Sequence, residues 1–322
     1  MKLLDYDRFE GFLARDYPGE NKRQERLVGI ERRTDSGYYD IHRFWGEHAV
    51  SPEEIHLRYL PEPFRLADER IAAYANEIAA YLREQGRLYD GPPVMRLERL
   101  DLSVRPVVAV VQAAAYPEQA GSSFAMDHAH PLFADYGGTL RDYYLREYRE
   151  TRFAHSPLCV CLGVCGQLII RDNGKLFMLL VRRSAKLASL ENSIGPSVAG
   201  SVDFVDGLAT MADLMRVSFA QEIEEELGLR ESDYRLIPLA IAREVLRGDR
   251  PQLFGLIIAE IGSGELKKRL EACREHGEFD QYELISLGEG RLALDQIARL
   301  NFEAKMSYYL AEEYLSDNKE VL

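Results

Sequence analysis

The chain of 322 residues is 46% hydrophobic and 29% charged, which is ordinary for a globular protein, and it is long enough for two domains. Its formal net charge of −13 argues against nucleic-acid binding, which needs a stripe of Lys and Arg. The polar residues after Met1 predict no signal peptide, and the longest apolar run, residues 157–170, is too short to cross a bilayer. We therefore expect a cytoplasmic protein that binds neither nucleic acid nor a membrane.

The first 155 residues predict a small α+β domain. Residues 1–60 are polar and have no clear periodicity. Beyond them, an apolar stripe predicts a helix and Val-rich runs predict strands. The expected elements are a helix over residues 65–88, strands over 94–100 and 105–115, and a helix over 139–152.

Residues 156–322 form the second predicted domain. Its first two strands, over residues 158–171 and 175–182, flank Asp172-Asn173-Gly174, a sequence typical of a tight hairpin turn. The elements expected next are a strand around Gly200, a helix from Thr210 to Gly228, strands over 234–244 and 252–261, and helices over 265–276 and 295–315.

Three of the four cysteines, Cys159, Cys161 and Cys165, lie in one apolar run, and Cys273 lies on a predicted amphipathic helix. Three neighbouring thiols suggest zinc, but they lie on a predicted strand rather than on a C-x-x-C knuckle. No His or Cys follows them at ligand spacing. We therefore expect buried, reduced cysteines, in keeping with the cytoplasm.

The most informative segment ends the helix expected before Gly228 and reads Gln-Glu-Ile-Glu-Glu-Glu-Leu-Gly-Leu. Glu222, Glu225 and Glu226 stand at positions i, i+3 and i+4, so their carboxylates project from one helical face. Like charges at these spacings repel one another, and a hard divalent cation such as Mg²⁺ would relieve the repulsion. The alternative is an acidic face that is simply solvated.

This segment resembles the signature of the Nudix hydrolase family, which is Gly, five residues, Glu, seven residues, then Arg-Glu-aliphatic-x-Glu-Glu-x-Gly-aliphatic. A matching frame begins at Gly207, with Asp213 at the position of the first Glu of the signature and Gln221 at the position of its Arg. A second frame takes Gly200 as the motif glycine and lengthens the following loop by about seven residues. We favour Gly200, because the strand pattern around it is better. Both frames place the three glutamates identically.

The resemblance implies an α/β fold for the second domain, a Nudix-type α/β/α sandwich with a mixed sheet. It also implies a pyrophosphatase that uses Mg²⁺, or Mn²⁺, to hydrolyse a nucleoside diphosphate linked to another group. The residues that it implies as metal ligands and catalytic groups are Glu222, Glu225 and Glu226, with the Gly200 carbonyl as a further metal ligand. The Asp213 and Gln221 substitutions remove an ion pair, which we expect an Asp213–Gln221 hydrogen bond to replace in part.

The N-terminal half resembles the UDP-glucose-cleaving Nudix proteins of eukaryotes. The resemblance lies in residues 88–97, which include Gly91-Pro92-Pro93, and in Tyr116 and Gly121-Ser122-Ser123. Those proteins have a small pre-Nudix domain, a lengthened motif loop, and Gln or a similar residue in place of the Arg. This second resemblance implies a UDP-sugar as the small-molecule substrate, giving UMP and a sugar 1-phosphate.

Other residues are candidates for substrate binding. Arg182, Arg183 and Lys186 lie just past a predicted strand and are either phosphate ligands or a solvent-exposed basic cluster. Asp127, with His128 and His130, either lines a sugar or base pocket or caps a helix. The sequence leaves the general base open, and the candidates are Glu222, Glu226 and Glu244.

The sequence also bears on three alternatives to the hydrolase. A catalytically silent Nudix-fold module that binds a nucleotide or a protein is favoured by the two departures from the signature and opposed by the intact glutamate triad. The absence of a basic recognition helix disfavours a DNA-binding regulator. An isomerase of the isopentenyl type would need a Cys in residues 195–200, which contain none. Whether the chain forms a homodimer is left open.

Overall fold

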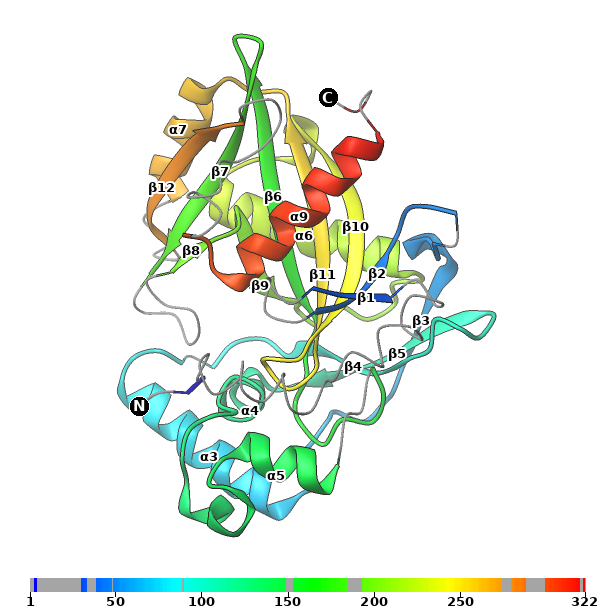
Figure 1. The fold of residues 1–322 in the computed structure, drawn as a ribbon, viewed down its shortest axis with the longest axis vertical. Helices are drawn as coiled ribbons and strands as arrows, with labels where there is room; N and C mark the ends of the chain where they lie inside the picture. Colours follow the sequence, from blue (N-terminus) through cyan, green and yellow to red (C-terminus); the bar gives the residue numbers. More distant parts are fainter. Residues whose placement is uncertain are drawn as a thin grey trace.

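The computed structural model describes residues 3–4, 30–33, 39–47, 49–88, 90–148, 153–184, 193–273, 279–287, 299–318 and 321. Within these residues the chain forms a large sheet, built mostly by its second half, and a small sheet built by its first half (Figure 1).

The large sheet has nine strands within the described part of the chain. In spatial order its main path consists of β1 (Ile30–Arg33), β2 (Tyr39–Arg43), β10 (Tyr234–Glu244), β11 (Arg250–Ala259), β6 (Gly163–Asp172), β7 (Lys175–Arg183) and β12 (Phe279–Ser286). Two short strands pair with β7 and β6, respectively, namely β8 (Ile194–Gly195) and β9 (Val198–Ser201). The sheet is mixed, because β11 and β6 run parallel whereas the other pairs are antiparallel.

The turn between β6 and β7 is the one that the sequence predicts. Asp172 pairs with Lys175, and between them Asn173 and Gly174 have φ angles of 49° and 74°. Two consecutive left-handed residues are the mark of a type I′ turn, whose twist matches that of the flanking strands and which favours Asn-Gly. The predicted hairpin is therefore confirmed.

Helices cover both faces of the large sheet (Figure 1). On one face, α6 (Met211–Leu227) and α7 (Ser263–Cys273) share a buried cluster with Leu168 of β6. On the other face, α9 (Phe302–Asp317) shares a second cluster with Ile169, the next residue of the same strand. Successive strand residues point to opposite faces, so β6 is buried between two helical layers. The predicted α/β fold with a mixed sheet between helices is confirmed.

In the described residues, the first half of the chain folds around a smaller sheet and three helices. The sheet has the order β3 (Ile55–Tyr59), β5 (Val107–Ala114) and β4 (Val94–Leu100), and the helices are α3 (Glu69–Glu84), α4 (Tyr116–Gly121) and α5 (Leu140–Glu147). Short 3₁₀ helices occur in this half at η3 (Pro52–Glu54) and η4 (Pro131–Tyr136), and in the second half at η5 (Glu231–Asp233). α3 begins later than predicted because the Asp68 carboxylate caps it, accepting from the Arg70 and Ile71 N–H groups at 2.8 and 3.0 Å.

Five of the described strands were not predicted: β1, β2, β3, β8 and β12. β2 pairs with β10 and places Ile41 opposite Ala242, so a segment of the first 155 residues belongs to the large sheet. The two halves are also joined around Met95, whose N–H donates to the Val202 carbonyl and whose carbonyl accepts from Leu162 N–H, each at 2.8 Å. The domain division at residue 155 remains a prediction.

The cysteines are free, as predicted. Cys159, Cys161 and Cys165 are fully buried, and burial raises the pKa of the Cys159 and Cys165 thiols well above the usual value. Among the described residues, no group of three or more His, Cys, Asp or Glu could hold a metal ion as the side chains now stand. The structure therefore gives no support to a zinc site at these thiols.

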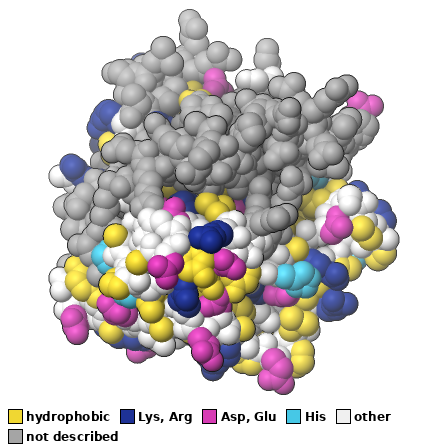
Figure 2. Space-filling model, turned by 60° about the horizontal axis from the view of Figure 1, so that its bottom comes forward, with side chains coloured by type: hydrophobic (Ala, Val, Ile, Leu, Met, Phe, Trp, Pro, Cys, Tyr) yellow, Lys and Arg dark blue, Asp and Glu magenta, His cyan; other side chains and the backbone are white. Residues whose placement is uncertain are grey.

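None of the helices in the described residues is long and apolar enough to span a membrane. In Figure 2, acidic and basic side chains are interspersed over the described part of the face shown, and His side chains lie among them.

Candidate functional site

Helix α6 has the limits that its sequence predicts. At its start, the Thr210 side chain accepts from the Asp213 N–H at 3.2 Å, and the Asp213 carboxylate accepts from the Thr210 N–H at 3.1 Å. This reciprocal capping box satisfies two N–H groups that the helix leaves free. At its end, Gly228 has a φ of 66° and donates its N–H to the Glu224 carbonyl at 3.0 Å.

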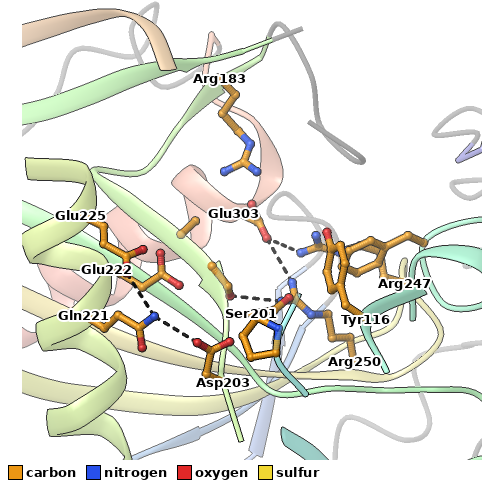
Figure 3. Close-up of a pocket in the computed structure, with 14 residues that line it drawn as sticks. Tyr116, Arg183, Ser201, Asp203, Gln221, Glu222, Glu225, Arg247, Arg250 and Glu303 are labelled. Atoms are coloured by element: carbon orange, nitrogen blue, oxygen red, sulfur yellow. Dashed lines mark hydrogen bonds and ion pairs between the residues drawn. The ribbon is translucent and has the colours of Figure 1, made fainter. Parts of the chain in front are cut away.

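The predicted glutamate face divides between a cleft and the protein interior. Glu222 and Glu225 line a cleft of about 490 Å³ at the edge of β9 (Figure 3). Glu226 is buried beside the cleft, and its carboxylate accepts from the Ala199 N–H at 3.3 Å. Residues at i, i+3 and i+4 thus remain on one side of the helix, but only two of the three carboxylates face the cleft directly.

Gly200 lies against this face. A Cβ atom at Gly200 would stand 1.7 Å from Oε1 of Glu222, so no larger residue fits while the carboxylate keeps its position. Gly207, the glycine of the other frame, lies in an exposed turn with a φ of 83° and has open space around its Cβ position. The geometry therefore supports the frame that begins at Gly200.

Gln221 braces the site in a way that the sequence did not indicate. Its side-chain amide donates to Asp203 Oδ2 at 3.1 Å and to Glu225 Oε1 at 3.2 Å. The expected Asp213–Gln221 hydrogen bond was wrong, because Asp213 lies two turns earlier in α6 and is engaged in the capping box. Gln221 instead links the loop after β9 to the cleft carboxylate.

The opposite wall of the cleft is basic. Arg183 at the end of β7, and Arg247 and Arg250 near the β10–β11 turn, line it together with Glu303 of α9 (Figure 3). Arg247 Nε donates to Glu244 Oε1 at 2.5 Å, and Arg247 also pairs with Glu303. Arg183, Arg247 and Arg250 outnumber the two carboxylates that pair with Arg247, which are Glu303 in the wall and Glu244 outside the cleft. The wall therefore keeps a net positive charge opposite the acidic helix.

Burial and charge set the protonation of this wall. Burial works to raise the pKa of Glu303, but the guanidinium groups of Arg247, Arg183 and Arg250 outweigh it, so the pKa is lowered and Glu303 is ionised. Burial raises the pKa of Glu244, and the charge of Arg247 opposes that shift. Glu244 is fully buried and does not line the cleft, and both of its oxygens accept from Arg247.

Arg250 fixes the position of β9. Its guanidinium donates from Nη2 to the Gly200 carbonyl and to Ser201 Oγ, each at 3.3 Å, and from Nε to the Cys161 carbonyl at 3.3 Å. Burial and the neighbouring Arg247 lower the pKa of Arg250 from its usual high value, and it remains a cation at neutral pH. The Gly200 carbonyl, which was predicted to bind metal, therefore already accepts a hydrogen bond from Arg250.

The remaining predicted residues lie in different places. Arg183 lines the cleft, and its Nε is buried without a hydrogen-bond partner among the described residues. Arg182, its neighbour on β7, is exposed and does not line the cleft, as strand alternation requires. Lys186 lies outside the described residues. His130 binds Glu77 at 3.1 Å and the Leu132 N–H at 3.2 Å, away from the cleft.

The predicted metal ligands have suitable donor atoms but do not converge in the described part of the chain. The predicted donors are carboxylate and carbonyl oxygens, the ligands that Mg²⁺ prefers, and Glu222 packs directly on Gly200. In the described part of the chain no three acidic side chains converge on one point, so binding would need rotation of side chains such as the exposed Glu225. The donor chemistry fits Mg²⁺, and the assignment of the ligands remains a prediction.

Several residues of the site were not predicted. They are Pro92, Tyr116, Phe124, Asp203, Arg247, Arg250 and Glu303. The sequence offered one signal, the concentration of arginines between positions 243 and 250 at a predicted turn between strands. Arginine is seldom fully buried without a partner, so such a cluster could have been assigned to a charged site rather than to the surface.

No family model and no curated protein matches the chain. It is similar to the solved structure of a mutT/nudix family protein from Listeria innocua, at 16% identity over 50% of this chain and 98% of that one, with a TM-score of 0.34. An Ap4A hydrolase from C. elegans is similar at 12% identity over 50% of this chain and 99% of that one, with a TM-score of 0.30. The Nudix domain of Shewanella oneidensis NrtR, solved with ADP ribose, is similar at 12% identity over 48% and 88%, with a TM-score of 0.30.

Proposed function

We propose that the chain is a Mg²⁺-dependent pyrophosphatase of the Nudix type that hydrolyses a nucleoside diphosphate linked to another group. The observation that carries the proposal is the polarity of the cleft, with Glu222 and Glu225 on one wall and Arg183, Arg247 and Arg250 on the other. A diphosphate carries negative charge on both phosphates, and it can be held between cations on both sides. The acidic wall supports such a substrate only when it carries a metal ion.

The residues of the cleft have separable roles in this proposal. Glu222, Glu225 and Glu226, with the Gly200 carbonyl, would hold Mg²⁺, which when bound neutralises phosphate charge and lowers the pKa of a bound water. Arg183, from the basic wall, binds the diphosphate and stabilises charge that develops on the leaving phosphate. Water attacks one phosphorus atom, the P–O bond to the bridging oxygen breaks, and two phosphate monoesters result.

Other residues prepare the site. Gln221 binds the Glu225 carboxylate by a 3.2 Å hydrogen bond without neutralising it. Glu222 lines the cleft, whereas Glu226 is buried beside it, so Glu222 is the better-placed candidate for the general base. Pro92 and Tyr116 add less polar surface to the lining of the cleft.

A UDP-sugar is the proposed substrate, with UMP and a sugar 1-phosphate as products. Pro92 and Tyr116 belong to the segments that resemble UDP-glucose-cleaving Nudix proteins, and both line the cleft. The volume of about 490 Å³ falls within the range of roughly 300–1,000 Å³ usual for small-molecule sites. The sugar or the base would therefore lie against the N-terminal half.

The second candidate is a catalytically silent nucleotide-binding module. It is favoured by the carboxylates of the described residues, which do not converge, and by Arg250, which occupies the Gly200 carbonyl. Both candidates predict nucleotide binding, and only the first predicts products.

A substrate screen distinguishes the two. Purified protein with Mg²⁺ or Mn²⁺ is incubated with UDP-sugars, ADP-ribose, NADH and dinucleoside polyphosphates, all of which resist alkaline phosphatase until they are cleaved. Phosphate released by added alkaline phosphatase then reports the monoester products. Turnover confined to UDP-sugars supports the proposal. Binding of a UDP-sugar without turnover in either metal supports the silent module.

A further inference from the structure

The β10–β11 loop, residues 245–249, is a hairpin turn that is buried throughout. In Figure 1 it extends from the large sheet towards α4 in the other half of the molecule. Turns between strands usually lie at the surface, because buried backbone groups must each find a hydrogen-bond partner. Several partners of this loop come from the N-terminal half of the chain, among them Arg141 and Tyr144.

Arg141 of α5 supplies two of these partners. Its guanidinium donates from Nη2 to the Leu246 carbonyl at 2.6 Å and from Nη1 to the Val245 carbonyl at 3.3 Å. Asp127 holds the other side of the guanidinium, accepting from Nε at 2.6 Å and from Nη2 at 2.9 Å. Both side chains are almost fully buried, so the guanidinium orientation is fixed by the carboxylate and the loop is fixed by the guanidinium.

The same loop is held at its other end. Asp249 has a φ of 69°, unusual for a residue other than glycine, and its carboxylate accepts from Tyr144 Oη at 2.5 Å and from Arg243 at 2.7 Å. At Gly248, an added Cβ would lie 2.5 Å from Leu158 Cδ1 and 3.2 Å from Met126 Sδ, so the backbone of the loop packs closely against both side chains. The loop is thus held on both sides of residue 247.

Arg247 is the cleft residue that this loop presents. It follows directly on the two carbonyls that Arg141 binds, and its guanidinium lies 5.1 Å from the Phe124 ring centroid and 5.3 Å from that of Phe302. Its own side chain forms ion pairs with Glu244 and Glu303. Because Arg247 is part of the loop, a shift of the loop would disturb these ion pairs and move the Arg247 charge relative to the diphosphate.

We propose that Arg141 and Asp127 are positioning residues for Arg247, acting through the Val245 and Leu246 carbonyls. In this way the N-terminal half sets the geometry of the basic wall of the cleft without contributing a charge to it. The inference rests on the proposed function, because it takes the basic wall to be the site of a diphosphate.

The test measures diphosphate affinity without catalysis. Methylenediphosphonate, a diphosphate that cannot be hydrolysed, is titrated in the presence of Mg²⁺ into full-length wild type, Arg141→Lys, and the matched control Arg146→Lys on the exposed side of α5. Lys keeps the charge beside Asp127 but cannot reach both carbonyls and the carboxylate together. We expect about tenfold weaker binding for Arg141→Lys, the loss of one charge-assisted hydrogen bond, and unchanged binding for Arg146→Lys. Asp127→Asn, which keeps the shape of the side chain, serves as a second variant if Arg141→Lys folds poorly.

A double-mutant cycle separates positioning from a general structural role. If Arg141 acts through Arg247, then Arg141→Lys weakens binding in the wild-type background and has no further effect in an Arg247→Met background. Equal losses in both backgrounds, or binding by Arg141→Lys equal to that of Arg146→Lys, would overturn the inference and leave the proposed function intact. Failure of the wild type both to bind the diphosphonate and to turn over any substrate would overturn both.

Discussion

Replacing Gly200 with Ala isolates the contact between β9 and the acidic helix. The new Cβ would lie 1.7 Å from Glu222 Oε1, and ordinary contact begins near 3.4 Å, so the carboxylate must move by about 1.7 Å. The obstructing atoms belong to the end of a flexible side chain, and an off-rotamer side chain costs about 0.5–1.5 kcal/mol. The Gly→Ala change itself returns about 0.4–1 kcal/mol by restricting the unfolded chain. We therefore expect the free energy of unfolding to change by less than about 1 kcal/mol.

Activity should respond much more strongly. A misplacement of about 1 Å at a catalytic site can lower the rate about 100-fold, so kcat/KM of Gly200→Ala should fall by one to two orders of magnitude, roughly. The matched control is Gly207→Ala, which has open space but a φ of 83°. It should lose about 1 kcal/mol of stability and keep its activity. Urea unfolding and initial rates on the substrate found by the screen measure both effects. Full activity in Gly200→Ala, or loss of activity in Gly207→Ala alone, would refute the assignment of Gly200 to the site.

Two further predictions use pairs of neighbouring groups. Arg183→Gln should raise KM for the diphosphate substrate about tenfold or more, because Arg183 lines the cleft. Arg182→Gln, on the exposed side of β7, should change KM less than about twofold. Steady-state kinetics measure both effects, and equal effects on KM would contradict the placement of Arg183 in the cleft. Burial works to raise the pKa of Glu98, but the hydrogen bond and charge of Arg96, with a smaller effect of His155, lower it overall. Glu98→Gln should therefore cost about 1 kcal/mol at pH 7. That cost should be complete above the unfolded pKa of about 4.3 and disappear as the pH falls through the lower folded pKa. Urea unfolding from pH 7 to pH 3 checks this, and a cost that grows towards low pH would contradict the sign.

The parts of the fold that the sequence predicts well are those with local chemistry. Thr210, Asp213 and Gly228 define the limits of α6 because caps act within a few residues. The Asn173-Gly174 turn needs two left-handed residues, and Asn and Gly are the residues that adopt that conformation most easily. The strands β2 and β12 could not be predicted in the same way, because they pair with β10 and β7, which lie far away in the sequence.

The same distinction between local and distant interactions applies to the candidate site. The acidic wall was predictable, since Glu222, Glu225 and Glu226 are brought together by one helix. The basic wall is assembled from β7, the β10–β11 loop and α9, and no local spacing connects Arg183, Arg247 and Glu303. The Asp213–Gln221 pair was expected because the motif frame was read from Gly207, and the lengthened loop after Gly200 brings Asp203 to Gln221 instead.

The central claim is that the glutamate face of α6 supports metal-dependent cleavage of a diphosphate. Phosphorus NMR of UDP-glucose with Mg²⁺ follows both products directly, in wild type, Glu225→Gln, Glu226→Gln and the control Glu224→Gln, whose exposed side chain does not line the cleft. The account predicts UMP and glucose 1-phosphate from wild type and Glu224→Gln, and neither product from Glu225→Gln or Glu226→Gln although both variants remain folded. Turnover retained in both Glu225→Gln and Glu226→Gln, or turnover by wild type that persists in excess EDTA, would contradict it.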